Sequence, residues 1–388
     1  MADPLQDLTT AGVSIWLDDL GRPLLTSGRL DSLVSGRHVV GITSNPTIFA
    51  NAISGSGAYD DQIADLSRQG ASTEEALRLL TVTDVRSACD VLRPVFEASQ
   101  GVDGRVSIEV DPHLADDTAG AVAQARQLRR LVDRPNVLIK IPATEAGLPA
   151  IAACLAEGIS VNVTLIFSLQ RYAEVVQAFL DGMERAKAAG HDLSDVVSVA
   201  SLFVSRVDTE IDRRLDQLGT PEARALKGRG AIANARLVHQ HFGEVFGGRR
   251  AAALAAGGAR PQRPLWASTG VKDPAYDDTR YVTELVTAGV VNTMPQATLA
   301  AVADHGEIRG DTIRQHYAEA AHVLHDLESV GVDYDDVMAV LEQQGLDKFA
   351  DSWALVTAEL DERLRRTQHK APGTPPTPLS TATTKRTP

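Results

Sequence analysis

Cysteine is almost absent from this sequence: its 388 residues include only Cys89 and Cys154. Two cysteines within apolar, helix-like stretches are too few for a disulfide framework, so we expect a protein of the reducing cytoplasm. No apolar run reaches the roughly 18 to 20 residues that cross a bilayer, and the N-terminus lacks a basic segment followed by an apolar one. The sequence therefore predicts neither secretion nor membrane insertion.

Basic residues are also scarce. Lysine and arginine total 38 against 51 aspartates and glutamates, which gives a net charge of −13 and a pI near 5.2. A general nucleic-acid binder needs a clustered basic surface, so this class of protein is disfavoured. With 44% hydrophobic residues, the chain can still build a large core. The composition leaves monomer and homodimer open and points away from nucleic acid and membranes as partners.

Short apolar, β-branched runs alternate with amphipathic stretches. Strands are expected at Val13–Leu17, Val39–Thr43, Val106–Val110, Val137–Ile141, Ser160–Thr164, Val196–Phe203, Pro264–Ser268 and Gly289–Thr293. Helices are expected at Thr73–Gln100 with Ser72 or Thr73 as N-cap, Asp117–Asp133, Leu169–Ala188, Ser205–Leu218, Ile232–Phe246, Asp278–Thr287 and Gly310–Val330. Eight βα units predict an α/β fold of the (β/α)8 TIM-barrel class with extra helices.

A doubly wound open sheet is the alternative architecture, but its glycine fingerprint is missing. Gly55-Ser56-Gly57 has no third glycine at the required spacing, so we interpret it as a loop turn. Gly247–Pro264 is expected to be a long irregular connection. Residues 1–366 should form a single barrel domain, and the Pro/Thr-rich segment 367–388 should be a disordered C-terminal tail.

Lys140 ends the apolar run Val137-Leu138-Ile139-Lys140, a position where an amine is costly to keep charged. A buried neutral lysine can attack a carbonyl and form a Schiff base. Lysines at strand ends also commonly extend their amines to water, so the residues around it decide between the two interpretations.

Polar side chains recur where the expected strands end, which is where the catalytic residues of a parallel barrel lie. Glu109 is a carboxylate within an apolar strand, suited either to pairing with a buried cation or to activating a water. Asp18 could accept a hydroxyl proton, while the adjacent Asp19 could instead cap a helix. The other strand-end residues are Asn45, Asn162, Thr164, Ser201 to Arg206, and Ser268.

Two of these groups suggest specific ligands. Asn162 and Thr164 share one face of their strand, and inward polar groups need a ligand, a water or each other. Ser201 and Arg206 suit a phosphate near a helix start. No metal site is expected, because His239 and His241 diverge on a helix, and His322 and His325 lack a carboxylate-rich set.

The motifs as a whole resemble the transaldolases, in the form typical of actinobacteria. The resemblance runs from about residue 8 to 362 and is carried by Ser14 to Leu20, Gly41 to Phe49, Ser107 to Pro112, Ile139 to Thr144, Asn162 to Ser168, Trp266 to Gly270 and Val291 to Pro295. It implies a cytoplasmic enzyme of the non-oxidative pentose phosphate pathway. Its substrates would be sugar phosphates, with no cofactor and no metal.

The resemblance also implies roles. Lys140 would form the Schiff base with the ketose carbonyl, and Asp18 would take the C4 hydroxyl proton as C3–C4 breaks. The remaining roles would be a proton-shuttling water held by Glu109 and Thr164, donor hydroxyls bound by Asn45 and Asn162, and phosphate bound by Ser201 and Arg206. Ser268 matches a substrate-end serine of the family, and Lys272 lies close to where other branches carry a second phosphate-binding arginine.

Three other functions are weighed against transfer. A fructose-6-phosphate aldolase resembles a transaldolase but replaces the glutamate by glutamine and the phenylalanine at 203 by tyrosine; Glu109 and Phe203 therefore favour transfer. A deoxyribose-phosphate-type aldolase tends to place its lysine on a later strand. A catalytically inactive barrel that only binds partners would not need Lys140.

Overall fold

Eight parallel strands form a closed barrel in a computed structural model that describes residues 3–370. They follow chain order, and β1 pairs with both β2 and β8. The predicted TIM-barrel class is confirmed, and the open-sheet alternative is wrong. The strands are β1 (Ser14–Asp18), β2 (Val39–Thr43), β3 (Arg105–Glu109), β4 (Val137–Pro142), β5 (Val161–Ile166), β6 (Ser198–Phe203), β7 (Arg263–Ala267) and β8 (Val291–Met294).

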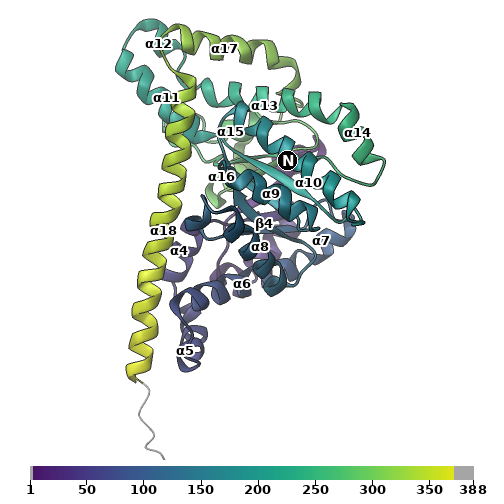
Figure 1. Cartoon of the computed structure of the whole chain (residues 1–388). Coiled ribbons are helices and arrows are strands. Elements are labelled where there is room, and N and C mark those ends of the chain that lie inside the picture. Colours follow the sequence, from purple (N-terminus) through teal and green to yellow (C-terminus); the bar gives the residue numbers. More distant parts are fainter. Residues whose placement is uncertain (1–2, 371–388) are drawn as a thin grey trace, which may run out of the picture.

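Helices cover the outside of the barrel (Figure 1). They are α1 (Pro4–Thr10), α2 (Arg22–Thr26), α3 (Arg29–Gly36), α4 (Pro46–Ser54), α5 (Asp60–Arg68), α6 (Thr73–Val91), α7 (Arg93–Ala98), α8 (Thr118–Val132), α9 (Gly147–Ala156), α10 (Leu169–Ala188), α11 (Ser205–Leu218), α12 (Pro221–Ala225), α13 (Gly230–Phe246), α14 (Arg249–Ala255), α15 (Arg280–Thr283), α16 (Gln296–His305), α17 (Tyr317–Ser329) and α18 (Tyr334–Lys370). Short 3-10 turns are η1 (Gly57–Tyr59), η2 (Pro112–Leu114) and η3 (Arg314–His316).

Strand register explains why the predicted residues gather at one end. Strands buried on both faces are apolar along their length, and β4 to β6 are buried throughout. Glu109 of β3 lies beside Lys140 of β4, which lies beside Asn162 of β5. The three polar residues are therefore neighbours because the parallel strands pair at matching depth.

Several expected helices differ from the observed ones. The predicted helix Thr73–Gln100 is two helices, α6 and α7, because Pro94 in the first turn of α7 cannot continue the hydrogen bonds of α6. Ser72 caps α6 as predicted, accepting from the Glu75 N–H at 3.2 Å. The predicted helix Asp278–Thr287 is reduced to α15, and the predicted helix Gly310–Val330 contains η3 before α17.

Glycine-rich connections are more regular than the sequence indicated. The predicted irregular segment Gly247–Pro264 contains helix α14, and β7 begins at Arg263, before that segment ends. Gly55 is the C-cap of α4, and Ser56 caps η1, so the Gly-Ser-Gly turn joins two helical elements. Alanine-rich runs between glycines retain helix propensity, which outweighed the flanking breakers in α14.

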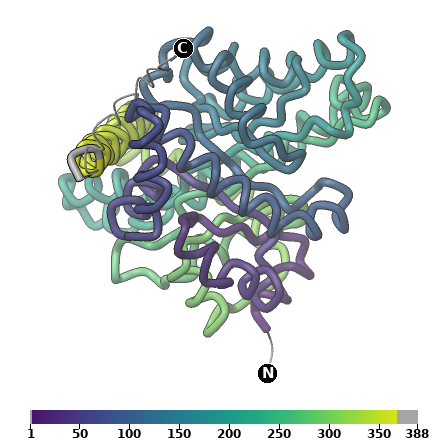
Figure 2. The backbone as a smooth tube through the Cα atoms, turned by 90° about the horizontal axis from the view of Figure 1, so that it is seen from below, coloured from purple at the N-terminus to yellow at the C-terminus, as the bar shows by residue number. Residues whose placement is uncertain are grey.

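The 37-residue helix α18 is the longest in the described chain, and the sequence analysis did not predict it. It runs along one side of the molecule and is viewed nearly end-on in Figure 2 (Figures 1 and 2). It extends through Lys370, so the tail boundary predicted at Thr367 falls within a helix. Residues 371–388 of the predicted tail lie outside the described residues. None of the described helices is long and apolar enough to span a bilayer.

Polar side chains seal the N-terminal end of the barrel. Arg263 donates to Ser14 Oγ and to Asp103 Oδ1, each at 2.9 Å, and Ser14 donates to Asp103 Oδ2 at 2.9 Å. Half-buried charges satisfied in this way stabilise the strand starts. The opposite end, where the strands finish, carries the cavity described below.

Gly41 of β2 provides a stability test of this packing. A Cβ at Gly41 would lie 2.4 Å from the ring of Trp16, which is fully buried. We expect Gly41→Ala to lower the free energy of unfolding by about 1–3 kcal/mol, because the ring has no space to move. Urea denaturation would measure the change. The control Gly36→Ala, where a Cβ meets nothing within 4 Å, should leave stability within about 0.5 kcal/mol; equal effects of both variants would contradict the packing account.

Candidate active site

Lys140 and Glu109 form a buried ion pair at the C-terminal end of the barrel. The amine lies 3.1 Å from Glu109 Oε2 and donates to the Ser44 carbonyl at 3.0 Å; both side chains are about 5% exposed. Burial raises the pKa of Glu109, while the lysine charge works in the opposite direction. A carboxylate with a raised pKa, in direct contact with the amine, is suited to exchange a proton with it.

Asp18, the last residue of β1, faces the same cavity. It accepts a hydrogen bond from Thr43 Oγ1 at 2.8 Å, and Thr43 also shares a 2.7 Å hydrogen bond with Thr293. Burial raises the pKa of Asp18, and the Lys140 charge and the Thr43 hydroxyl lower it in part. Asp19 accepts from Gln296 instead of capping α2, whose N-cap is Gly21. Asp18 is therefore the carboxylate directed to the cavity.

Asn162 lies within the barrel, beneath the cavity. Its amide donates to Ser107 Oγ at 2.9 Å, and its carbonyl accepts from Ser201 Oγ at 2.7 Å. Ser201 lines the cavity, so Asn162 also contacts a cavity residue from below. Thr164 is fully buried, and its hydroxyl has no hydrogen-bond partner among the described residues. A buried hydroxyl with that free capacity can hold a water or a ligand oxygen.

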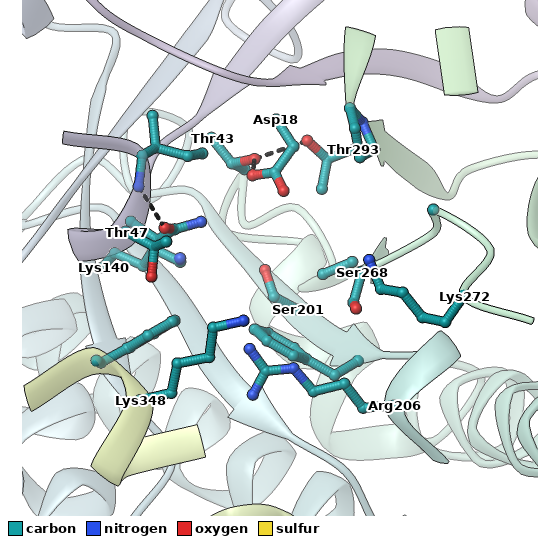
Figure 3. Close-up of a pocket in the computed structure, with 17 residues that line it drawn as sticks. Asp18, Thr43, Thr47, Lys140, Ser201, Arg206, Ser268, Lys272, Thr293 and Lys348 are labelled. Atoms are coloured by element: carbon teal, nitrogen blue, oxygen red, sulfur yellow. Dashed lines mark hydrogen bonds between the residues drawn. The ribbon is translucent and has the colours of Figure 1, made fainter. Parts of the chain in front are cut away.

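The cavity is lined by residues from most strands and from α18 (Figure 3). Asn45 uses its carbonyl to cap α4, accepting from the Ile48 N–H at 2.9 Å, which leaves its amide as a donor. The lining residues are Asp18, Thr43, Asn45, Thr47, Ile48, Lys140, Ser201, Phe203, Arg206, Ala267, Ser268, Gly270, Lys272, Thr293, Pro295, Lys348 and Phe349. The predicted residues Glu109, Asn162 and Thr164 are not part of this lining.

Each of two cations in the cavity lies near an aromatic ring. Arg206, whose guanidinium lies 5.2 Å from the centre of the Phe203 ring, has its pKa lowered by burial. Phe349 of α18 is 3% exposed and lies 5.6 Å from the Lys140 amine. The Lys140 amine is thus covered by an apolar ring, whereas the guanidinium faces the cavity with no ion-pair partner among the described residues.

Two residues at the strand ends adopt left-handed backbone conformations. Leu165 follows Thr164 with φ of 57°, at a register shift in β5, and Ser268 follows β7 with φ of 54°. Such conformations are costly for residues other than glycine and cluster at functional sites. Ser268 hydrogen-bonds through its hydroxyl to that of Ser205, at the first turn of α11.

Some lining residues were missed by sequence reasoning. Thr43 and Thr293 end or nearly end their strands, so the strand-end rule that selected Asp18 would have found them. Lys348 and Phe349 had no such signal, because they lie in the middle of a helix far along the chain. Among the described residues, no group of three or more His, Cys, Asp or Glu side chains is arranged to hold a metal ion.

Comparison with known proteins agrees with this geometry. Residues 15–360 match the family described as Transaldolase/Fructose-6-phosphate aldolase. The chain belongs to this family. It is 60% identical over 370 residues to a transaldolase of Acidothermus cellulolyticus, covering 95% of this chain and 99% of that protein. It is also 63% identical over 353 residues to a transaldolase of Thermobifida fusca, covering 91% and 96%.

A third relative is Transaldolase 2 of Streptomyces coelicolor, 58% identical over 366 residues, with 94% of this chain and 98% of that protein covered. All three relatives come from actinobacteria, and each is named as a transaldolase. The predicted resemblance to the transaldolases is therefore confirmed, and the alternative of an inactive binding barrel is not supported.

The ion pair of this family member provides a stability test that does not depend on turnover. Lys140→Met leaves Glu109 buried without its cation, which should lower the free energy of unfolding by about 3–5 kcal/mol at about pH 8. Losing the lysine raises the pKa of Glu109 further, so protonation relieves the cost when the pH falls to about 5. Urea denaturation at both pH values would measure this.

The double variant Lys140→Met/Glu109→Gln serves as the control, since it removes both charges. It should recover most of the stability at pH 8 and lose the extra pH dependence. If the single variant were equally destabilised at both pH values, the account of a buried uncompensated carboxylate would be refuted.

Proposed function

We propose that this chain catalyses the transaldolase reaction with Lys140 as the nucleophile. It transfers a dihydroxyacetone unit between sedoheptulose 7-phosphate and glyceraldehyde 3-phosphate, giving erythrose 4-phosphate and fructose 6-phosphate. The observation that carries this proposal is the contact between the Lys140 amine and the Glu109 carboxylate, covered by Phe349, beside Asp18. Family membership and the relatives' named activity support the same reaction.

Proton transfer to Glu109 starts the reaction. The neutral Lys140 amine attacks the ketose carbonyl carbon, and loss of water from the adduct gives a protonated imine. A water held by Glu109 and Thr164 carries the protons of these steps, for which the unpartnered Thr164 hydroxyl is available. The ketose carbonyl oxygen leaves as a separate water molecule, with one hydrogen from the amine and the proton returned from Glu109, which is then ionised again.

Carbon–carbon cleavage follows. Asp18 accepts the C4 hydroxyl proton, the C3–C4 bond breaks, and its electrons move to the imine nitrogen. The aldose phosphate leaves, and a dihydroxyacetone enamine remains on Lys140. Attack of this enamine on an acceptor aldehyde, with the proton returned from Asp18, forms the C–C bond of the product and leaves it bound to Lys140 as a protonated imine. Addition of water to this imine releases the new ketose phosphate and restores the Lys140 amine. Asn45 binds a donor hydroxyl, and Asn162 orients Ser201 from beneath the cavity. Ser201, Arg206, Ser268 and Lys272 bind the phosphate end.

Aldol cleavage without transfer is the second candidate, because the family description names both activities. Transfer requires that the enamine survive until an acceptor arrives, which in turn requires that water be excluded. Phe349 covers Lys140 with an apolar ring, and Phe203 adds a second ring to the cavity lining beside Arg206. This arrangement favours transfer over hydrolysis.

The reaction itself is tested with fructose 6-phosphate as donor. We expect glyceraldehyde 3-phosphate to accumulate only when erythrose 4-phosphate is also present, because the enamine needs an acceptor. A coupled assay for glyceraldehyde 3-phosphate would measure both conditions. Sustained product without an acceptor would establish the aldolase instead.

Borohydride trapping identifies the nucleophile. With fructose 6-phosphate present, reduction should attach a three-carbon unit to the peptide containing Lys140, as measured by peptide mass spectrometry. Lys140→Met should remain unlabelled and inactive. Label on another lysine would refute the assignment.

Asp18 should determine the acid limb of the pH profile, because it must be ionised to accept the proton. Removing the Thr43 hydroxyl destabilises the carboxylate, so Thr43→Val should raise the pKa of Asp18 and shift the acid limb of kcat/KM to higher pH by roughly 0.5–1 unit. Steady-state kinetics across pH would measure the shift.

Thr293→Val is the matched control, because Thr293 contacts Thr43 but has no hydrogen bond to Asp18. The acid limb of the kcat/KM profile of this variant should stay close to that of the unmodified enzyme. Asp18→Asn, which lacks the base, should lose about 10²- to 10⁴-fold in kcat. Coincident limbs for Thr43→Val and the unmodified enzyme would exclude Asp18 as the titrating base.

A further inference from the structure

Helix α18 contributes two consecutive side chains, Lys348 and Phe349, to the cavity mouth. Phe349 is buried over Lys140, whereas Lys348 is exposed at the opening. In Figure 3 the amine of Lys348 points into the cavity, toward the side where Arg206 lies (Figure 3). A surface lysine would be expected to extend toward bulk solvent, so this direction requires a cause.

Three cations meet at this opening: Arg206, Lys272 and Lys348. Partial burial lowers the pKa of Lys348, and the positive charges of Arg206 and Lys272, which line the same cavity, lower it further. No ion pair involves any of the three within the described part of the chain. An unliganded cluster of like charges is costly, and an anion bound between the three would offset that cost.

Elsewhere along α18, arginines on the helix or next to it form ion pairs with carboxylates. Arg171 pairs with Glu342 of α18, and Arg365 pairs with Asp361 one turn away. Arg363 contacts Asp60 of α5. Lys348 differs from these cations: Asp347 is adjacent to it and Asp351 lies one turn further along α18, but neither forms an ion pair with it in the described part of the chain.

Lys348 is also held in place by contacts on both sides of it along α18. One turn before it, Gly345 packs so closely that a Cβ there would lie 3.0 Å from Leu165 Cδ2. One turn after it, Ser352 shares a 2.7 Å hydrogen bond with Thr47, which itself lines the cavity. Because the helix is fixed at both points, the amine can reach the cavity without any movement of the backbone.

We propose that Lys348 is a phosphate-binding residue, which completes with Arg206 and Lys272 a three-cation site for the phosphate group of the sugar substrates. This inference rests on the proposed function for the identity of the substrate and deepens it by assigning substrate recognition to α18. The phosphate stays at the solvent-facing opening, where a dianion is least costly, while the carbonyl end reaches Lys140. Two neighbouring residues of one helix therefore bind the anion and cover the nucleophile.

The test compares donors with and without a phosphate. Lys348→Met keeps the apolar stem and removes the charge. We expect kcat/KM for fructose 6-phosphate to fall about 10- to 100-fold, mainly through KM, as is typical for one charged hydrogen bond. The slow reaction with unphosphorylated fructose should change less than about twofold. Lys348→Arg should restore most of the activity toward fructose 6-phosphate.

Arg365→Met is the matched control. It removes the same charge from the same helix, at a side chain that is 72% exposed and outside the cavity lining. Both donors should react as with the unmodified enzyme. This excludes an effect of net charge or of a long-range field.

Binding of inorganic phosphate, measured by calorimetry, tests the site without turnover. Its dissociation constant should rise about 10-fold or more in Lys348→Met and stay unchanged in Arg365→Met. If Lys348→Met weakened neither phosphate binding nor the preference for fructose 6-phosphate over fructose, the inference would be overturned. Equal losses for both donors would likewise overturn it, by showing that Lys348 only supports the helix.

The two proposals fail in different ways. If the unmodified enzyme does not transfer the three-carbon unit, the proposed function fails, while the phosphate-binding comparison still decides the role of Lys348. If transfer is normal and Lys348→Met retains its phosphate affinity, only the inference about Lys348 fails.

Discussion

The buried contact between Lys140 and Glu109 is the constraint on which the rest of the site depends. An isolated charge at that depth would be destabilising, so each group requires the other. The contact exists because β3 and β4 pair in parallel with Glu109 opposite Lys140. The same pair that makes burial tolerable also provides a route for the proton that must leave the amine before it can react.

The two ends of the barrel differ in how their polar side chains are hydrogen-bonded. At the N-terminal end, Asp103 and Arg263 are satisfied by each other and by Ser14, which closes that end. At the C-terminal end, polar groups remain available: the Thr164 hydroxyl has no partner and Arg206 has no carboxylate in the described residues. These two groups can therefore bind a ligand at the end of the barrel where the substrate enters. Leu165 and Ser268, which have left-handed backbone conformations, lie at the same end.

Helix α18 connects the last part of the chain to this chemistry. It packs against α4, α5 and α6 as well as against β5, so it bridges elements that are distant in sequence. The helix packs closely at Gly345 and forms a hydrogen bond through Ser352, and these contacts place Phe349 over the Lys140 amine. Exclusion of water, on which transfer depends, is therefore a property of this helix together with the barrel.

Much of this site was predictable from local pattern. The barrel strands are apolar on both faces, so runs such as Val137 to Ile141 were recognised, and polar residues at their ends identified Lys140, Asp18 and Glu109. Boundaries were less predictable: Pro94 divided an amphipathic stretch into two helices, and α14 formed within a glycine-rich segment. In the first case a proline interrupted an amphipathic helical pattern, and in the second case helix-favouring alanines were flanked by helix-breaking glycines.

The sequence by itself determined the eight strands, their parallel order and the strand-end residues. A strand that is buried on both faces can be recognised from its own continuous run of apolar residues. Only the tertiary structure decided that Asn162 lies beneath the cavity between Ser107 and Ser201, and that Lys348 reaches into it. A lysine among charged residues on a helix resembles any solvated one. Arg206 and Lys272, the two cations that line the cavity together with Lys348, belong to other barrel units. Only long-range packing brings the three side chains together.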